Sequence, residues 1–265
     1  MAGTSFFETI AQRDRMVVSC GLLLVIGLSW AYLLTGAGTM EEMGGMFMPM
    51  SPEIWTPGHA LLMFVMWAVM MAAMMLPSAF PMILFYAMVD RNRRVKSGQS
   101  SGPRTSVFAG GYLICWLAFS LFAVTLQYAL KKATLLSRMM ETTSVILAAA
   151  IFVAAGIYQF TPLKQACLRN CRSPLDFVVN HWREGRLGAL IMGIEHGIYC
   201  TGCCWMLMLL LFVGGVMNLA WISGIAILIL VEKFMPLGHW IGKAAGIVLI
   251  LWGIGVFIGR LQLPS

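Results

Sequence analysis

Residues 193–205 read GIEHGIYCTGCCW, and they lie inside an apolar segment that runs from about residue 187 to residue 213. Within ten residues this stretch carries one carboxylate, one imidazole and three thiols. Ionisable side chains are costly in hydrocarbon, so inside a membrane they usually mark a function. On an α-helix, spacings of four and three place His196, Cys200 and Cys203 on one narrow stripe. Cys204 lies beside the stripe and Glu195 on another face, a pattern typical of a soft-metal site or of a thiol redox site.

The composition indicates an integral membrane protein. Of the 265 residues, 60% are hydrophobic and only 11% are charged, whereas soluble domains carry roughly 25% charged residues. The net charge of +7 does not indicate nucleic-acid binding, because the basic residues fall in predicted loops, where they set membrane topology. The seven cysteines are an odd number and lie mostly in or near apolar segments, which does not match a secreted disulfide framework.

About 20 apolar residues cross a bilayer, and by this measure the chain contains about seven spans. We place them at residues 16–34, 59–89, 105–130, 143–160, 187–213, 218–235 and 240–258. Six spans are the alternative, because the fourth and sixth are marginal. The second is so long that it must tilt, or break near Pro77 and Pro81. We therefore expect residues 1–265 to form a single all-α, polytopic transmembrane helical bundle.

Lysine and arginine predict the orientation of the chain in a plasma membrane. The N-terminal tail, the 90–104 loop and the 161–186 connection are basic and should be cytoplasmic. The 35–58 loop has no lysine or arginine and should lie outside. The 131–142 loop is an exception, because it is basic yet falls on the outer side. Seven spans would place the C-terminus outside, with which Arg260 weakly disagrees.

Two groups of methionines predict soft-metal binding, since thioethers favour Cu(I). The first is the outer 35–58 loop, where five of the 22 methionines lie between residues 40 and 50; its candidate ligands are Met43 and Met46. The second is a stripe on one face of the second span, with spacings of four, three, four and four. Its members are His59, Met63, Met66, Met70 and Met74. The alternative interpretation is contact with lipid for the loop and ordinary helix packing for the stripe.

Further ionisable residues lie outside the 193–205 stretch. Cys167 and Cys171 are one helical turn apart in a basic segment, which favours the thiolate form and allows both to bind one ion. The same pair would also suit a membrane-surface anchor or a palmitoylation site. Glu232 and Lys233 lie near the inner end of the sixth span, and we expect them to stabilise each other or to lie near the cytoplasmic surface.

Three blocks of the chain resemble a bacterial family of predicted metal-binding integral membrane proteins. The blocks are residues 66–77 (MWAVMMAAMMLP), residues 158–168 (YQFTPLKQACL) with 171–174 (CRSP), and residues 197–205 (GIYCTGCCW). One branch of that family consists of copper chaperones for tyrosinase-type polyphenol oxidases. The resemblance, which runs from about residue 60 to residue 235, implies copper handling and cuproenzyme maturation in a bacterial inner membrane, not catalysis.

These patterns favour a membrane copper chaperone that is not an enzyme. Cu(I) would be collected at the outer loop, passed along the methionine stripe, held by His196, Cys200 and Cys203 with Cys204 as a flanking ligand, and released through Cys167 and Cys171. The expected partners are the lipid bilayer, the copper ion and a cuproenzyme or copper-carrier client. The first alternative is a thiol–disulfide oxidoreductase that uses Cys200 and Cys203, and the second is a non-catalytic transport or assembly subunit. The client, the direction of transfer and the oligomeric state stay open.

Overall fold

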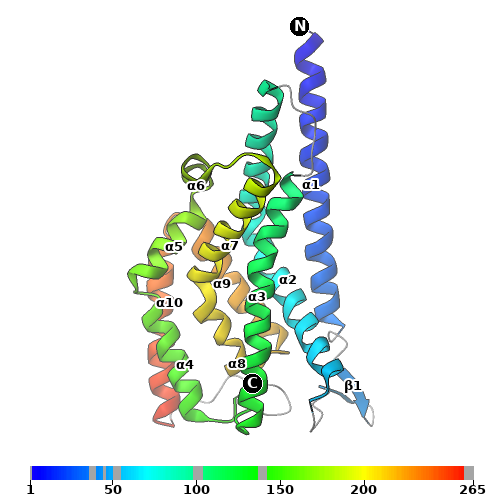
Figure 1. The fold of residues 1–265 in the computed structure, drawn as a ribbon. Coiled ribbons are helices and arrows are strands. Elements are labelled where there is room, and N and C mark those ends of the chain that lie inside the picture. Colours follow the sequence, from blue (N-terminus) through cyan, green and yellow to red (C-terminus); the bar gives the residue numbers. More distant parts are fainter. Residues whose placement is uncertain are drawn as a thin grey trace.

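A computed structural model shows a bundle of long helices that is capped at one end by two short ones (Figure 1). The structure describes residues 2–35, 40–43, 46–49, 55–97, 104–136 and 142–259, with side chains for 16–35, 55–95, 104–136 and 142–259. The elements are α1 (Ala2–Leu34), β1 (Met40–Met43), β2 (Met46–Pro49), α2 (Pro57–Ser97), α3 (Arg104–Lys132), α4 (Val145–Tyr158), α5 (Pro162–Arg172), α6 (Pro174–His181), α7 (Gly185–Leu209), α8 (Leu211–Gly214), α9 (Leu219–Phe234) and α10 (Gly238–Phe257). The predicted helical architecture is confirmed, apart from the short antiparallel hairpin of β1 and β2.

The predicted count of about seven spans is not confirmed. Among the described residues, five helices are long and apolar enough to cross a membrane, namely Met16–Leu34, Pro57–Val95, Arg104–Lys132, Gly185–Gly214 and Gly238–Phe257. A sixth is added only if α4 and α5, which meet at a bend of 64°, are one span. The predicted fourth and sixth spans are helices of 14 and 16 residues, α4 and α9, both short of the roughly 20 residues that a bilayer requires.

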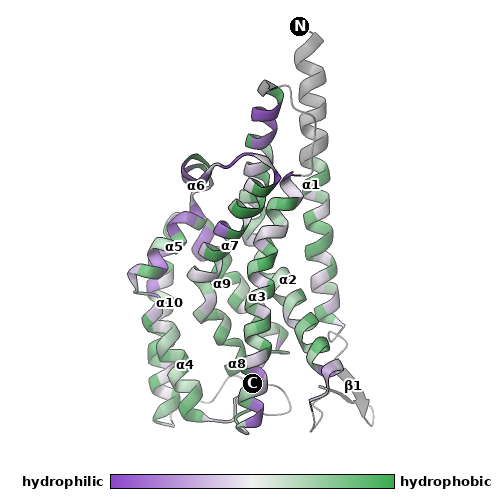
Figure 2. Cartoon of the chain, viewed as in Figure 1, coloured by the Kyte–Doolittle hydropathy of each residue, from purple (hydrophilic) through white to green (hydrophobic). Residues whose placement is uncertain are grey.

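The two ends of the bundle differ in polarity. The helices α1, α2, α3, α4, α7, α9 and α10 run lengthwise, with α5, α6 and the C-terminal end of α2 at one end and the β1–β2 hairpin at the other (Figure 1). Hydrophilic residues gather at the α5–α6 end, while the lengthwise parts are mostly apolar (Figure 2). Lys131 and Lys132, the basic exception on the other side, occupy the last turn of α3, where positive charge is favourable to the helix dipole.

α2 crosses the prolines without ending. It is a single helix of 41 residues that contains both Pro77 and Pro81, and it changes direction in its middle (Figure 1). Of the two alternatives, a tilt or a break near the prolines, the break does not occur. Pro77 has no N–H for the Ala73 carbonyl one turn earlier, and the indole Nε1 of Trp30 on α1 donates to that carbonyl at 3.2 Å instead. This bond satisfies the freed carbonyl and fixes α1 against α2.

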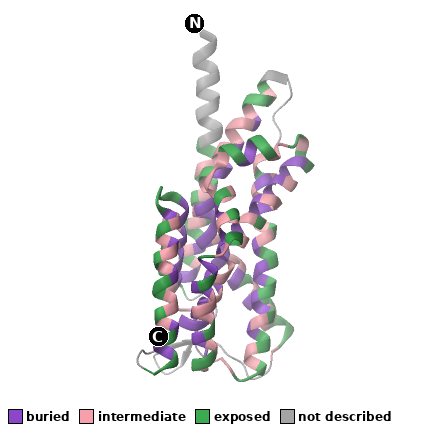
Figure 3. Ribbon diagram, turned by 90° about the vertical axis from the view of Figure 1, so that its left-hand side faces the viewer, coloured by how far each residue is buried: buried purple, intermediate pink, exposed green. Residues whose placement is uncertain are grey.

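Close packing of α3 on α7 sets the position of the interior side chains. The two helices pack along each other, and a Cβ on Gly193 would meet the backbone of Phe108, while a Cβ on Gly111 would meet the backbone of Leu190 and Gly193. Glycine at such contacts lets two helices approach closely. Buried residues consequently line the inside of the bundle and exposed residues its outer faces (Figure 3).

Candidate functional site

Three thiols of α7 lie in the interior of the bundle. Cys200, Cys203 and Cys204 are all buried. The Cys203 and Cys204 thiols both donate to the backbone carbonyl of Cys200, at 3.1 and 3.0 Å. The Cys204 thiol also lies close enough to the thiols of Cys200 and Cys203 to interact with them. The predicted stripe is thus turned inward, and Cys204 belongs to the same cluster.

α5 adds two further thiols to this cluster. The helix begins where the Thr161 side chain accepts from the N–H of Lys164, with Pro162 in the first turn, a common N-terminal arrangement. The sharp bend after α4 lays α5 against α7. The Cys171 thiol is half-buried and lies close enough to the thiols of Cys200 and Cys203 to interact with them, and the Cys167 side chain lies directly against Gly202. The cysteines that were expected at a separate cytoplasmic exit therefore belong to the α7 cluster.

A buried lysine lies beside the thiol cluster. The Nζ of Lys233 on α9 donates to the Sγ of Cys200 at 3.0 Å and to the Oγ of Ser78 on α2 at 2.9 Å. The Oη of Tyr112 on α3 lies 3.2 Å from the same sulfur. Sequence reasoning missed Ser78 and Tyr112. Lys233 could be noticed in the sequence as an ionisable residue in an apolar helix. The sequence suggested Glu232 as its partner, whereas the structure gives Cys200.

Glu232 and Lys233 do not pair with each other, which was one of the two expectations for them. Consecutive residues on a helix point about 100° apart, and here they face different neighbours. The Glu232 carboxylate pairs with the Lys164 Nζ of α5 at 2.7 Å, with both side chains almost fully buried. Gln159 completes this group, since its Nε2 donates to Glu232 at 3.0 Å and its Oε1 accepts from Lys164. This ion pair joins α5 to α9 beside the thiol cluster.

His196 lies among aromatic rings. Its imidazole is buried, and its ring centroid lies 5.3 Å from that of Phe177, 5.8 Å from Tyr112 and 6.2 Å from Phe108. Its Nδ1 finds no hydrogen-bond partner among the described residues, which is uncommon for a buried polar atom. Glu195, which lies on another face of α7, forms an ion pair with Arg183 at 2.9 Å.

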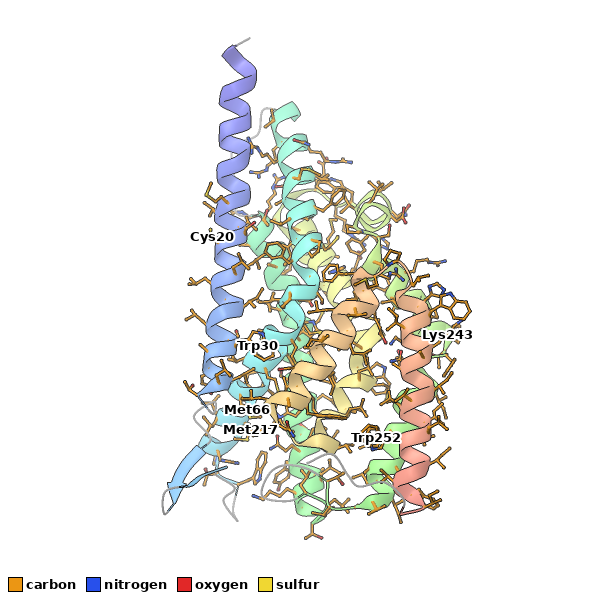
Figure 4. The ribbon with its side chains drawn as sticks, turned by 180° about the vertical axis from the view of Figure 1, so that it is seen from behind. Cys20, Trp30, Met66, Met217, Lys243 and Trp252 are labelled. Carbon is orange, nitrogen blue, oxygen red and sulfur yellow. The ribbon has the colours of Figure 1, made fainter. Side chains whose placement is uncertain are left out.

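The methionine stripe of α2 faces the interior of the bundle. Met63, Met66, Met70 and Met74 are completely buried, and Figure 4 shows Met66 toward the hairpin end. The stripe continues to Met75, whose sulfur lies 3.9 Å from the Cys204 thiol. At the other end, the half-buried His59 packs edge-on against Trp55, with ring centroids 5.1 Å apart. Met43 and Met46 face each other across the hairpin, but their side chains lie outside the described part of the chain.

The donors that meet in this interior are soft. Thiolate and thioether ligands favour Cu(I), zinc and iron–sulfur centres over hard cations such as magnesium and calcium. In the ranges that the structure describes, no three His, Cys, Asp or Glu side chains are arranged to hold one metal ion. The structure therefore shows a cluster of soft donors around an ammonium group, not a completed coordination shell.

Comparison with known proteins identifies the family of the chain. Residues 64–256 match the family model described as PpoB2, copper chaperone. No curated protein and no solved structure matches the chain. The matched region includes Met66, Met70 and Met74 of the stripe on α2, but not Met63, and it includes all the cysteines of α5 and α7. Since the match covers well over half of the 265 residues, the chain belongs to the PpoB2 copper chaperone family and is a copper-handling protein, not an enzyme.

Proposed function

We propose that this chaperone is embedded in the bacterial inner membrane and carries Cu(I) on the thiols of α5 and α7. The observation that carries the proposal is the convergence of Cys171, Cys200, Cys203 and Cys204 from two helices in the bundle interior. Buried thiols that only fill space need no such clustering. Cu(I) is a soft ion that thiolates bind well, so the cluster suits copper as cargo.

Membrane embedding is supported by the outer surface of the bundle. Large apolar side chains point outward on α1, α3 and α10, among them Leu23, Leu28, Leu121, Ile247 and Leu251. Such a surface is unfavourable in water but matches lipid tails. The hydrophilic α5–α6 end (Figure 2) carries Arg169, Arg172, Arg183 and Arg186. By the positive-inside rule we place this end, and with it the N-terminus, in the cytoplasm.

We further propose that copper reaches the thiols along the thioethers of α2. The stripe from Met63 to Met74 is turned away from lipid, and Met75 continues it to the Cys204 sulfur. Thioethers need no deprotonation and bind Cu(I) more weakly than thiolates, so an ion would move from the outer end toward the cluster. The unpartnered Nδ1 of His196 offers one more soft donor near the thiols.

Delivery to a client would take place at α5. Because Cys171 lies beside Cys200 and Cys203, a copper ion could pass directly from a thiol of α7 to a thiol of α5. Cys167 lies one turn earlier on α5, against Gly202. The cysteine-bearing helix lies at the proposed cytoplasmic end, where a cuproenzyme or a copper carrier would take the ion.

The experiment that tests the proposal compares copper bound by purified wild-type protein and by a Cys200→Ser/Cys203→Ser variant. Both are loaded anaerobically with Cu(I) in detergent, and copper per protein is measured. We expect the variant to lose most of its copper, because serine hydroxyls are poor ligands for a soft ion. A Cys20→Ser variant is the matched control, since Cys20 is exposed on α1 away from the cluster (Figure 4). Equal copper in all three proteins would refute the site.

One observation also favours a redox role for the same thiols. The Cys171 thiol of α5 lies beside the Cys200 and Cys203 thiols of α7, so oxidation of the cluster would join the two helices by a disulfide. Such a bond would occupy the proposed copper ligands. Mass spectrometry of protein alkylated in cells distinguishes the two roles. A dominant disulfide between α5 and α7 in copper-replete cells would favour thiol–disulfide chemistry, and free thiols would favour copper binding.

A further inference from the structure

We propose that Lys233 makes the thiol site selective for monovalent ions, because its fixed positive charge balances Cu(I) bound by two thiolates. The inference rests on the proposed function, and it assigns to one residue the discrimination between Cu(I) and divalent thiol-binding ions such as Zn(II) and Cd(II). It concerns charge and position, so Lys233 is a positioning and specificity residue and not a ligand.

The surroundings of Lys233 require an anion. The side chain is buried, and its two hydrogen-bond acceptors are the Ser78 hydroxyl and the Cys200 sulfur. Among the described residues it forms no ion pair with a carboxylate. A buried ammonium group without a counter-charge is strongly unfavourable. The Cys200 sulfur at 3.0 Å is the group that can supply the negative charge.

The other charges near the cluster already balance one another. The Lys164 ammonium and the Glu232 carboxylate form a closed pair at 2.7 Å. Farther along α7, Glu195 is paired with Arg183. His196 is surrounded by aromatic rings. The net charge of the site is therefore set by Lys233, the thiolates and the bound ion.

The net charge of the occupied site differs between monovalent Cu(I) and divalent ions such as Zn(II) and Cd(II). Two thiolates, one Cu(I) and one ammonium give zero, whereas two thiolates, one divalent ion and one ammonium give a net positive charge. A net charge inside a membrane bundle is costly. The neutral combination is consequently favoured, and the site discriminates against Zn(II) and Cd(II) although thiolates bind both ions well.

Hydrogen bonds hold the ammonium in place beside the sulfur. The Ser78 hydroxyl donates to the Met75 carbonyl at 2.8 Å and so presents a lone pair to Lys233. The Tyr112 hydroxyl lies within hydrogen-bonding distance of both the Met75 carbonyl, at 3.1 Å, and the Cys200 sulfur. α2, α3, α7 and α9 therefore fix the charge at one point, which a merely space-filling lysine would not require.

The test measures the ratio of Cu(I) affinity to Cd(II) affinity in the full-length protein. Cu(I) is buffered by a competing chelator, and Cd(II) binding is followed by thiolate-to-metal absorption. We expect Lys233→Met and Lys233→Gln each to lower this ratio by about tenfold or more, because removing the ammonium leaves the Cu(I) complex negative and makes the Cd(II) complex neutral. Lys233→Arg keeps the charge and should restore the ratio at least in part.

Two controls separate this inference from the proposed function. Lys243→Met removes a lysine that lies over the Trp240 ring on α10, at the edge of the bundle (Figure 4), and should leave the ratio unchanged. A Cys171→Ser/Cys200→Ser/Cys203→Ser variant reports whether the thiols bind copper at all. If that variant binds Cu(I) like wild type, the proposed function fails. If it loses Cu(I) but the Lys233 variants keep the wild-type ratio, or lose both ions in parallel, the charge inference alone is overturned.

Discussion

The Lys233 Nζ lies 3.0 Å from the Cys200 Sγ, although 33 residues separate them in the chain. α7 and α9 are joined through α8 and a turn at Gly215, whose φ of +87° is readily adopted by glycine. The chain reverses direction there, so the C-terminal half of α9 returns beside the thiols of α7. This contact places an ammonium group next to the cysteines of α7.

Cys171 should matter for copper binding as much as the thiols of α7. We expect Cys171→Ser to lower bound Cu(I) substantially, because its thiol contacts both Cys200 and Cys203. Copper per protein after anaerobic loading is the measurement, with Cys20→Ser as the control. If Cys171→Ser binds as much copper as the control, α5 has no part in holding the ion.

The thioethers of α2 should affect the rate of loading more than its extent. Met66→Leu/Met70→Leu conserves volume, and such swaps cost less than about 1.5 kcal/mol in stability. We expect slower uptake of Cu(I) and an unchanged final content, since the thiolates bind the ion at equilibrium. Stopped-flow measurement of chelator release follows uptake. Met82→Leu, also buried on α2 but outside the stripe, is the control, and equal rates for both variants would show that the stripe is only packing.

The buried pair of Lys164 and Glu232 should be important for stability. Lys164→Met leaves the Glu232 carboxylate buried without its charge partner, and removal of one member of a buried pair costs about 3–5 kcal/mol. Lys164→Met/Glu232→Met removes both charges and should recover much of that loss. Unfolding in detergent, followed by circular dichroism, gives the free energies. A double variant that is less stable than the single one by the full cost of Glu232→Met would contradict the pairing.

Close packing of α3 on α7 should depend on Gly193. A methyl group there would meet the Phe108 backbone, so we expect Gly193→Ala to destabilise the protein by about 1–3 kcal/mol through overpacking. The Tyr112–Cys200 contact should weaken as well, because the helices must separate. Gly110→Ala is the matched control, since its Cβ would meet nothing within 4 Å. The measurement is the thermal unfolding midpoint of each variant. Similar midpoints for Gly193→Ala and Gly110→Ala would refute the close contact between α3 and α7.

The fold could be predicted only as far as local patterns reach. The apolar runs correctly predicted a helical bundle, in whose described residues five helices are long and apolar enough to cross a membrane, because a run of about 20 apolar residues is typical of a spanning helix. They marked α4 and α9 only as marginal spans, and they left open whether α2 breaks near Pro77, where Trp30 satisfies the Ala73 carbonyl. That bond comes from another helix, and helical periodicity holds no information about it.

The sequence by itself determined which residue types share a helical face. Spacings of three and four placed Cys200 and Cys203 together on α7 and the methionines together on α2, since 3.6 residues make one turn. Only the tertiary structure decided what those faces meet. It places Cys171 beside the α7 thiols, Lys233 in hydrogen-bonding contact with Cys200, and Glu232 in an ion pair with Lys164. These partners lie on different helices, and their contacts depend on how the helices pack, which spacing within one helix cannot specify.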